Sequence, residues 1–185
     1  RATGRYAWPR DTIGRAPDHN TAEWSLMIGR PLLGQWTLDV RRALDALGEN
    51  GGALPKEITV IGVGPAGVVA LCAAALDPRI TAVATVGSLA SYVSETPYSG
   101  QRLGLMAPGI LREAGDIAHL AALVAPRRLI VAGGVDGGGA PLAADRLDRE
   151  YAYARGIYTL VGAASALTIA PEAAPGDLLA WLRHR

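Results

Sequence analysis

The chain has 185 residues, a formal net charge of +1 and a composition that is half apolar. This length suits a single domain with a real hydrophobic core, and the apolar content excludes a disordered chain. The net charge is close to zero and the basic residues form no stripe, so nucleic acid is not an expected partner. Apolar runs fall short of the ~20 residues that cross a bilayer, so a membrane is not expected either. Cys72 is the only cysteine, which rules out an internal disulfide and leaves the cellular compartment undetermined.

The amino-terminal part of the chain is polar and rich in turn-forming residues. Residues 1–20 are therefore predicted to be a loop-rich segment, and residues 21–185 a single domain. The chain starts without a methionine or a signal-peptide pattern, and we expect it to be part of a longer protein. Asn20 and Glu23 have the spacing of a helix N-cap and its N3 partner, which predicts a short helix from Thr21 to about Ile28.

A clearer amphipathic helix is predicted from Trp36 to Leu47, because apolar residues recur on one helical face. Strands and helices then alternate. Short runs rich in β-branched residues predict strands at 57–62, 80–86, 128–132 and 167–170. Helical patterns are found at 66–77, 117–124, 141–155 and 177–185. This alternation predicts an α/β fold, a three-layer α/β/α sandwich with a mostly parallel sheet.

In parallel α/β sheets the functional site lies beyond the carboxyl ends of the strands. Two glycine-rich loops follow predicted strands, one from Gly62 to Gly67 and one from Gly133 to Gly139. In the first loop, Pro65 is well placed to open the next helix. These two loops are therefore the candidates for a functional site.

Four stretches of the sequence resemble the α/β-hydrolase superfamily, in particular its acetyl xylan esterase and dienelactone hydrolase-like members. They are Trp36-x-x-Asp39-x-x-Arg42-x-x-Asp45, Ile58 to Asp77, Asp116 to Arg127, and Ile157 to Trp181. The resemblance covers roughly Trp24 to Arg185 and implies the carboxyl-terminal portion of an α/β-hydrolase fold. It also implies ester hydrolysis as the ancestral activity, with an ester or carbohydrate as the ligand.

The resemblance assigns roles to three positions. The family's nucleophile lies in a G-x-S-x-G turn, and the matching residues here are Gly62-Val63-Gly64-Pro65-Ala66. Gly64 takes the serine position, where it offers no nucleophile but tolerates the positive φ of the turn. Pro65 follows and has no backbone N–H for an oxyanion hole. Asp136 takes the position of the triad acid; alternatively, it is a turn carboxylate that accepts backbone N–H bonds.

A histidine should follow the last strand, but residues 171–177 contain none. His19, His119 and His184 lie elsewhere and are expected to be structural. Triad residues act as a unit, so an isolated acid contributes little. We therefore predict a degenerate esterase-like domain that is inactive, with no cofactor and no metal. The remaining candidate nucleophiles are expected to be turn or loop serines and a buried structural thiol, namely Ser88, Ser91, Ser94, Ser99 and Cys72.

Two other interpretations stay open. One is an active carboxylic-ester hydrolase with a non-standard nucleophile. The other is an FAD- or NAD-binding domain in which Gly62, Gly64 and Gly67 cradle the pyrophosphate. That fingerprint requires an acidic residue about 20 positions further on, and the second strand ends without one. Finally, the family's front strands are missing, which leaves a sheet edge exposed, so we expect another domain or chain to pack there.

Overall fold

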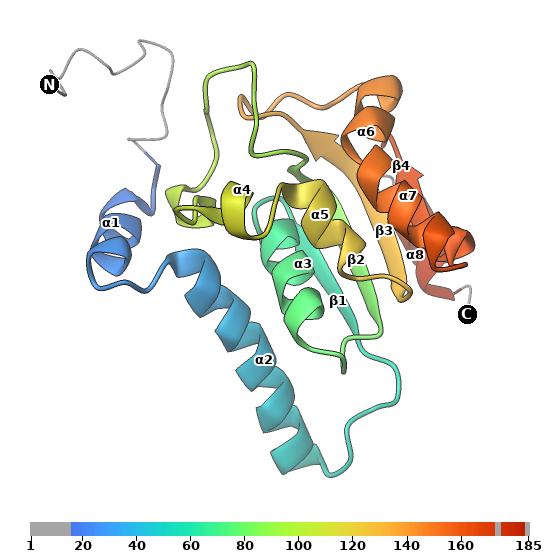
Figure 1. The fold of residues 1–185 in the computed structure, drawn as a ribbon. Coiled ribbons are helices and arrows are strands. Elements are labelled where there is room, and N and C mark those ends of the chain that lie inside the picture. The colour runs from blue at the N-terminus through green and yellow to red at the C-terminus, as the bar shows by residue number, and fades with distance from the viewer. Residues whose placement is uncertain (1–15, 173–174, 184–185) are drawn as a thin grey trace, which may run out of the picture.

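The computed structural model describes residues 16–172 and 175–183, so most of the predicted loop segment 1–20 lies outside the described residues. In chain order the elements are α1 (His19–Met27), α2 (Leu32–Gly51), β1 (Thr59–Val63), α3 (Ala66–Leu76), β2 (Ala82–Leu89), α4 (Ile110–Glu113), α5 (Ile117–Ala122), β3 (Arg128–Val135), α6 (Ala144–Glu150), α7 (Ala152–Leu160), β4 (Leu167–Ala170) and α8 (Pro175–Arg183) (Figure 1). Short 3-10 turns cover Leu103–Leu105 and Ala164–Ala166. None of the described helices is long and apolar enough to cross a membrane.

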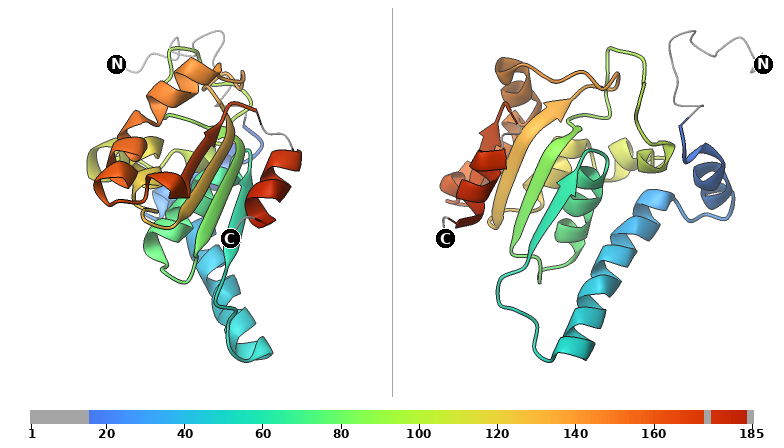
Figure 2. Two further views of the ribbon diagram at one scale, coloured as in Figure 1. Left: turned by 90° about the vertical axis from the view of Figure 1, so that its right-hand side faces the viewer. Right: turned by 180° about the vertical axis from the view of Figure 1, so that it is seen from behind.

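The four strands form one sheet in the order β1-β2-β3-β4, and every neighbouring pair is parallel. In the middle of the sheet Ile61 is level with Ala84, Ala84 with Ile130, and Ile130 with Thr168. Helices α3, α5 and α7 cover one face, and α8 lies on the other (Figure 2). The predicted α/β class and its parallel sheet are confirmed.

The main core lies between the sheet and the layer of α3, α5 and α7. Helix α3 is apolar on all sides because it is enclosed by the sheet, α2 and α5, and its Val68 and Leu71 are almost fully buried. A smaller cluster under α8 contains Ala84 and Ile130, with Trp181 packed against it. The two clusters place the sheet at the centre of the molecule.

Two helix starts differ from the sequence prediction. Helix α1 begins at His19 and not after an Asn20 cap, and the residue before it, Asp18, makes no side-chain cap bond. Instead the Asp18 carboxylate accepts the backbone N–H groups of Leu103 and Gly104, at 3.1 and 2.9 Å. That carboxylate therefore joins α1 to a loop more than 80 residues away, a contact that local spacing cannot predict.

Helix α2 starts at Leu32, directly after Pro31, and is longer than predicted. Its predicted apolar face ends early, because Leu44 is buried whereas Leu47 is 62% exposed. The predicted helix 141–155 is two helices that meet at the buried Tyr151, where the backbone leaves helical geometry. Strand β3 also continues through Gly133 and Gly134, which were predicted to be loop.

A cluster of ion pairs around the buried Asp77 connects α2 to the end of α3. Asp77 is 2% exposed, and its two carboxylate oxygens accept from Arg79 Nε and Nη2 at 2.9 and 2.6 Å. The remaining branch of that guanidinium, Nη1, donates to Asp45 on α2 at 2.6 Å. The hydrogen bonds from Arg79 lower the pKa of Asp77 to about 2.

This ion pair makes the stability of the folded state dependent on pH. Because the folded-state pKa of Asp77 lies below the unfolded value of about 4, its stabilisation is complete above pH ~4 and is lost as the pH falls towards 2. The contribution is on the order of 2 kcal/mol. In urea titrations across this pH range, Asp77→Asn is expected to be less stable at neutral pH and to show a flatter pH dependence. Parallel curves for the two proteins would contradict this assignment.

Candidate active site

The turn between β1 and α3 is where the sequence resemblance places a nucleophile elbow. Only Gly64 and Pro65 separate the two elements, and Gly64 has a φ of +56°, the left-handed conformation that the turn requires. Its N–H donates to Val86 O on the neighbouring strand at 2.8 Å, and Gly67 N donates to Gly64 O at 3.0 Å. A Cβ at Gly64 would meet no atom within 4 Å. The elbow thus has room for a side chain that the sequence does not supply.

Pro65 is the residue that the sequence resemblance places at the oxyanion-hole position. Its φ of −55° and ψ of −32° are helical, so it leads directly into α3. A proline nitrogen in a peptide bond carries no hydrogen. This residue therefore contributes no oxyanion-hole donor.

The two flanking glycines are required by packing. A Cβ at Gly62 would lie 2.3 Å from Ala66 O, and a Cβ at Gly67 would lie 1.8 Å from Ser88 Oγ. Close approach of the helix to the strands thus explains both glycines without a pyrophosphate. The described strand order also contains no reversal beside β1, which is an edge strand, whereas dinucleotides bind where the order reverses. Both observations weigh against the dinucleotide alternative.

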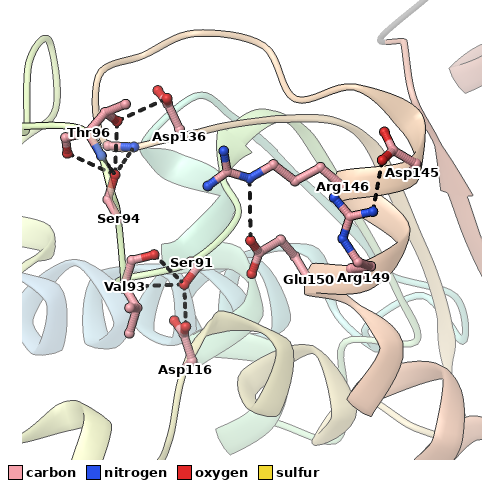
Figure 3. A network of polar contacts seen from close by, with 11 residues as sticks. Ser91, Val93, Ser94, Thr96, Asp116, Asp136, Asp145, Arg146, Arg149 and Glu150 are labelled. Carbon is pink, nitrogen blue, oxygen red and sulfur yellow. Dashed lines mark hydrogen bonds and ion pairs between the residues drawn. The ribbon is translucent and has the colours of Figure 1, made fainter.

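Asp136 directly follows β3, at the carboxyl edge of the sheet where the sequence places it. One carboxylate oxygen, Oδ1, accepts the N–H of Ala140 at 2.9 Å and closes the glycine-rich turn. The other, Oδ2, accepts the Thr96 hydroxyl at 2.9 Å (Figure 3). Both oxygens therefore hold loops together, and a role as triad acid stays a prediction.

Hydroxyl groups after β2 hold the same turn from the other side. Ser94 Oγ accepts the N–H of Gly137 at 3.1 Å, and Thr96 Oγ1 accepts that of Gly138 at 3.2 Å. Figure 3 shows Ser94 and Thr96 beside Asp136. Sequence reasoning missed Thr96, because no motif marks its hydroxyl contacts with Asp136 and Gly138, which lie 40 and 42 positions away. The loop after β2 and the turn after β3 thus form one hydrogen-bonded unit.

Two other serines of this region differ in their surroundings. Ser91 donates to the carboxylate of Asp116, which also accepts the Tyr92 N–H at 2.7 Å and caps α5 (Figure 3). Ser88 was predicted to be a loop residue but lies inside β2, 3% exposed, and its hydroxyl has no hydrogen-bond partner among the described residues. Neither serine lies in an elbow.

The space among these groups is small. A cavity of about 10 Å³ is lined by residues that include Ser91, Ser94, Asp136, Arg146 and Glu150. That volume holds at most about one water molecule.

The described histidines are engaged elsewhere. His119 Nδ1 accepts the backbone N–H of Asp116 at 3.1 Å, completing the cap of α5, and its ring stacks on Tyr153 at 4.2 Å. His19 Nε2 lies 3.4 Å from Glu23 Oε1, one turn further along helix α1. Neither is hydrogen-bonded to Asp136, and His184 lies outside the described residues.

Cys72 is the remaining candidate nucleophile. Its thiol is half-buried and packs against the main core. Burial raises its pKa to about 11, which disfavours the reactive thiolate at neutral pH. Within residues 16–172 and 175–183, no group of three or more His, Cys, Asp and Glu could hold a metal ion.

Comparison with known proteins identifies the fold. No protein-family model and no curated protein matches the chain. Among solved structures it is similar to a protein from Bacteroides fragilis NCTC 9343 assigned as an acetyl xylan esterase, with a TM-score of 0.63 and 16% identity over 82% of this chain and 39% of that one. A glucuronoyl esterase of carbohydrate esterase family 15 from Caldicellulosiruptor kristjansonii gives 0.61 and 22% identity, over 81% and 48%. One from Teredinibacter turnerae T7901 gives 0.56 and 21%, over 81% and 44%.

The chain therefore spans less than half the length of the solved esterases that it resembles. Their names agree with the resemblance carried by the sequence motifs. Together with the parallel sheet and the elbow after β1, they show that this chain has the fold of the α/β-hydrolase-type esterases.

Proposed function

We propose that this chain is an α/β-hydrolase-like domain of the acetyl xylan esterase type that has no serine-esterase chemistry of its own. One observation carries the proposal: the elbow after β1 has the required left-handed backbone, but its central residue is Gly64. A glycine has no group that could attack an ester carbonyl. The chain thus has the backbone of the elbow but lacks a nucleophilic side chain at its centre.

Three further features support the proposal. Pro65 offers no oxyanion donor, and losing one such donor costs about 100- to 1,000-fold in rate. Both oxygens of Asp136 bond to loop groups and not to a histidine. The cavity next to Asp136 holds about 10 Å³. Ester hydrolysis needs an oxyanion donor, an acid bonded to a histidine and space for the substrate, and each feature leaves a different one of these needs unmet.

The proposed role is structural support or recognition. The similar solved structures are named as esterases of carbohydrate substrates, so the ligand class we propose is an ester or a carbohydrate. We also propose that the chain is part of a larger protein or assembly. Its match to less than half of each similar esterase supports that view.

Turnover of p-nitrophenyl acetate tests the loss of activity. The purified chain is expected to show no saturable rate above the same chain after heat unfolding. Gly64→Ser is the informative variant, because the site has room for the side chain. It is expected to remain inactive, since a serine there still lacks a histidine base and the Pro65 N–H.

An active hydrolase would give a different result. A saturable rate that is lost on unfolding, together with stoichiometric labelling by a fluorophosphonate, would overturn the proposal. Ser91→Ala would then locate the nucleophile, because Ser91 donates its hydroxyl hydrogen to a carboxylate, that of Asp116. Labelling that survives this variant would exclude Ser91.

A further inference from the structure

The small cavity beside Asp136 has two charged side chains in its wall that are close to each other but not hydrogen-bonded. Arg146 Nε lies 3.7 Å from Glu150 Oε1, one turn further along α6. Hydrogen bonds between nitrogen and oxygen span about 2.7 to 3.2 Å, so this separation is too long for one. Among the described residues, the two Nη atoms of Arg146 and Glu150 Oε2 have no hydrogen-bond partner. Free donors and free acceptors therefore lie side by side in this wall.

Both side chains can be reached from solvent. That of Arg146 is 34% exposed and that of Glu150 is 28% exposed. Figure 3 shows both pointing away from α6 towards the loop that carries Ser91 and Ser94. The cavity between them and this loop measures about 10 Å³, which is the space of about one water-sized group. A single hydroxyl group fits this space, whereas a carboxylate or a phosphate is larger than it.

The rest of the cavity wall offers no competing hydroxyl donor. Ser91 and Ser94 each donate their hydroxyl hydrogen to an oxygen atom of the protein. Val93, which also lines the cavity, is apolar and 66% exposed. A hydroxyl group that enters would therefore be bound by Arg146 as donor and Glu150 as acceptor, with apolar surface next to it.

The charges of the wall select against anions. Asp136 and Glu150 contribute two carboxylates, and Arg146 contributes one guanidinium, so negative charge is in excess. Like charges a few ångströms apart repel each other strongly near a protein surface. Hydrogen bonds from a neutral hydroxyl to charged groups are in contrast stronger than those between neutral groups. The wall thus favours a neutral, hydroxyl-bearing ligand.

We propose that this cavity is a subsite for a neutral sugar and takes up one of its hydroxyl groups. The hydroxyl oxygen accepts from an Nη atom of Arg146, and the hydroxyl hydrogen is donated to Glu150. The apolar face of the sugar ring then packs on Val93. The choice of a sugar rests on the proposed function, whereas the preference for a neutral hydroxyl group rests on the cavity itself. Gly64 does not line this cavity, so the subsite is distinct from the elbow.

Xylotriose, which carries no charge and no ester, is the probe for this subsite. We expect it to shift the backbone amide NMR signals of Val93 and Gly137 saturably in the native chain, because both residues line the cavity. Xylotriose with every hydroxyl group methylated cannot donate to Glu150, and it is expected to leave these signals unchanged. Glucuronate carries a carboxylate and is expected to leave them unchanged as well.

Arg146→Met is expected to weaken the xylotriose affinity about tenfold or more, because it removes a charged hydrogen-bond donor. Arg149→Met is the matched control on the same helix and is expected to leave the affinity unchanged. Arg149 is 69% exposed, is bonded to Asp145 at 2.8 Å and does not line the cavity.

Four results would overturn the subsite. They are unchanged signals of Val93 and Gly137 with xylotriose, equal shifts with the methylated sugar, binding of glucuronate as tight as that of xylotriose, and equal affinities of the two methionine variants. Turnover of p-nitrophenyl acetate would refute the proposed inactivity but would not alter the xylotriose titrations. The two proposals can therefore fail separately.

Discussion

Replacing Gly62 with alanine is expected to lower the free energy of unfolding by about 3 kcal/mol, the upper end of the usual cost of overpacking. The added Cβ would lie 2.3 Å from Ala66 O and 2.5 Å from Gly67 Cα. Both are backbone atoms of the first turn of α3, so no side-chain rotation can relieve the clash. Either α3 must move away from the sheet or β1 must shift its register.

Gly64→Ala is the matched control in the same turn. Its Cβ would meet nothing within 4 Å, so its cost is limited to the left-handed backbone, about 1 to 2 kcal/mol. Urea unfolding of the two variants, followed by far-UV circular dichroism, gives the comparison. If Gly64→Ala destabilises the protein more than Gly62→Ala does, then α3 does not lie as close to β1 as the structure places it. A larger loss at Gly62 would support packing, rather than a bound pyrophosphate, as the reason for that glycine.

The order of elements could be predicted from the sequence because it depends on local patterns. The strands β1 and β4 and the all-apolar helix α3 each lie close to where runs of apolar and β-branched residues predict them. The turn at Gly64 could also be predicted, since a left-handed residue between a strand and a helix is encoded by neighbours in the sequence. Local patterns are therefore enough for the sheet and the elbow.

The surroundings of the site could not be predicted in this way. Thr96 meets Asp136 across 40 positions, and Asp18 meets Leu103 across 85. Such pairs depend on the path of the long loop after β2, which carries no periodic signal. The exposed fraction of Val63 is likewise a tertiary property, because it depends on what packs on that face of the sheet. Side-chain contacts between loops therefore required the structure.

A second large effect is expected at Arg127, whose guanidinium joins two segments of the chain. Its Nη1 donates to Asp77 O and Ile80 O at 3.1 and 2.9 Å, between α3 and β2. Its Nε and Nη2 donate to Val124 O and Leu123 O, after α5, at 3.1 and 3.3 Å. Arg127→Met preserves much of the side-chain volume but leaves these carbonyls without their donor. We expect a loss of about 3 kcal/mol, because hydrogen bonds from charged groups contribute about 1.5 to 3 kcal/mol.

Two comparisons isolate the geometry of the guanidinium from its charge. Arg155→Met removes an arginine whose pair with Asp148 is exposed, so it is expected to cost less than about 1 kcal/mol. Arg127→Lys keeps the charge but replaces the planar fork by a single ammonium, which cannot reach carbonyls on both sides at once. Its stability in urea should fall between those of wild type and Arg127→Met. A lysine variant as stable as wild type would show that charge alone is sufficient, and the bridging role of Arg127 would then be wrong.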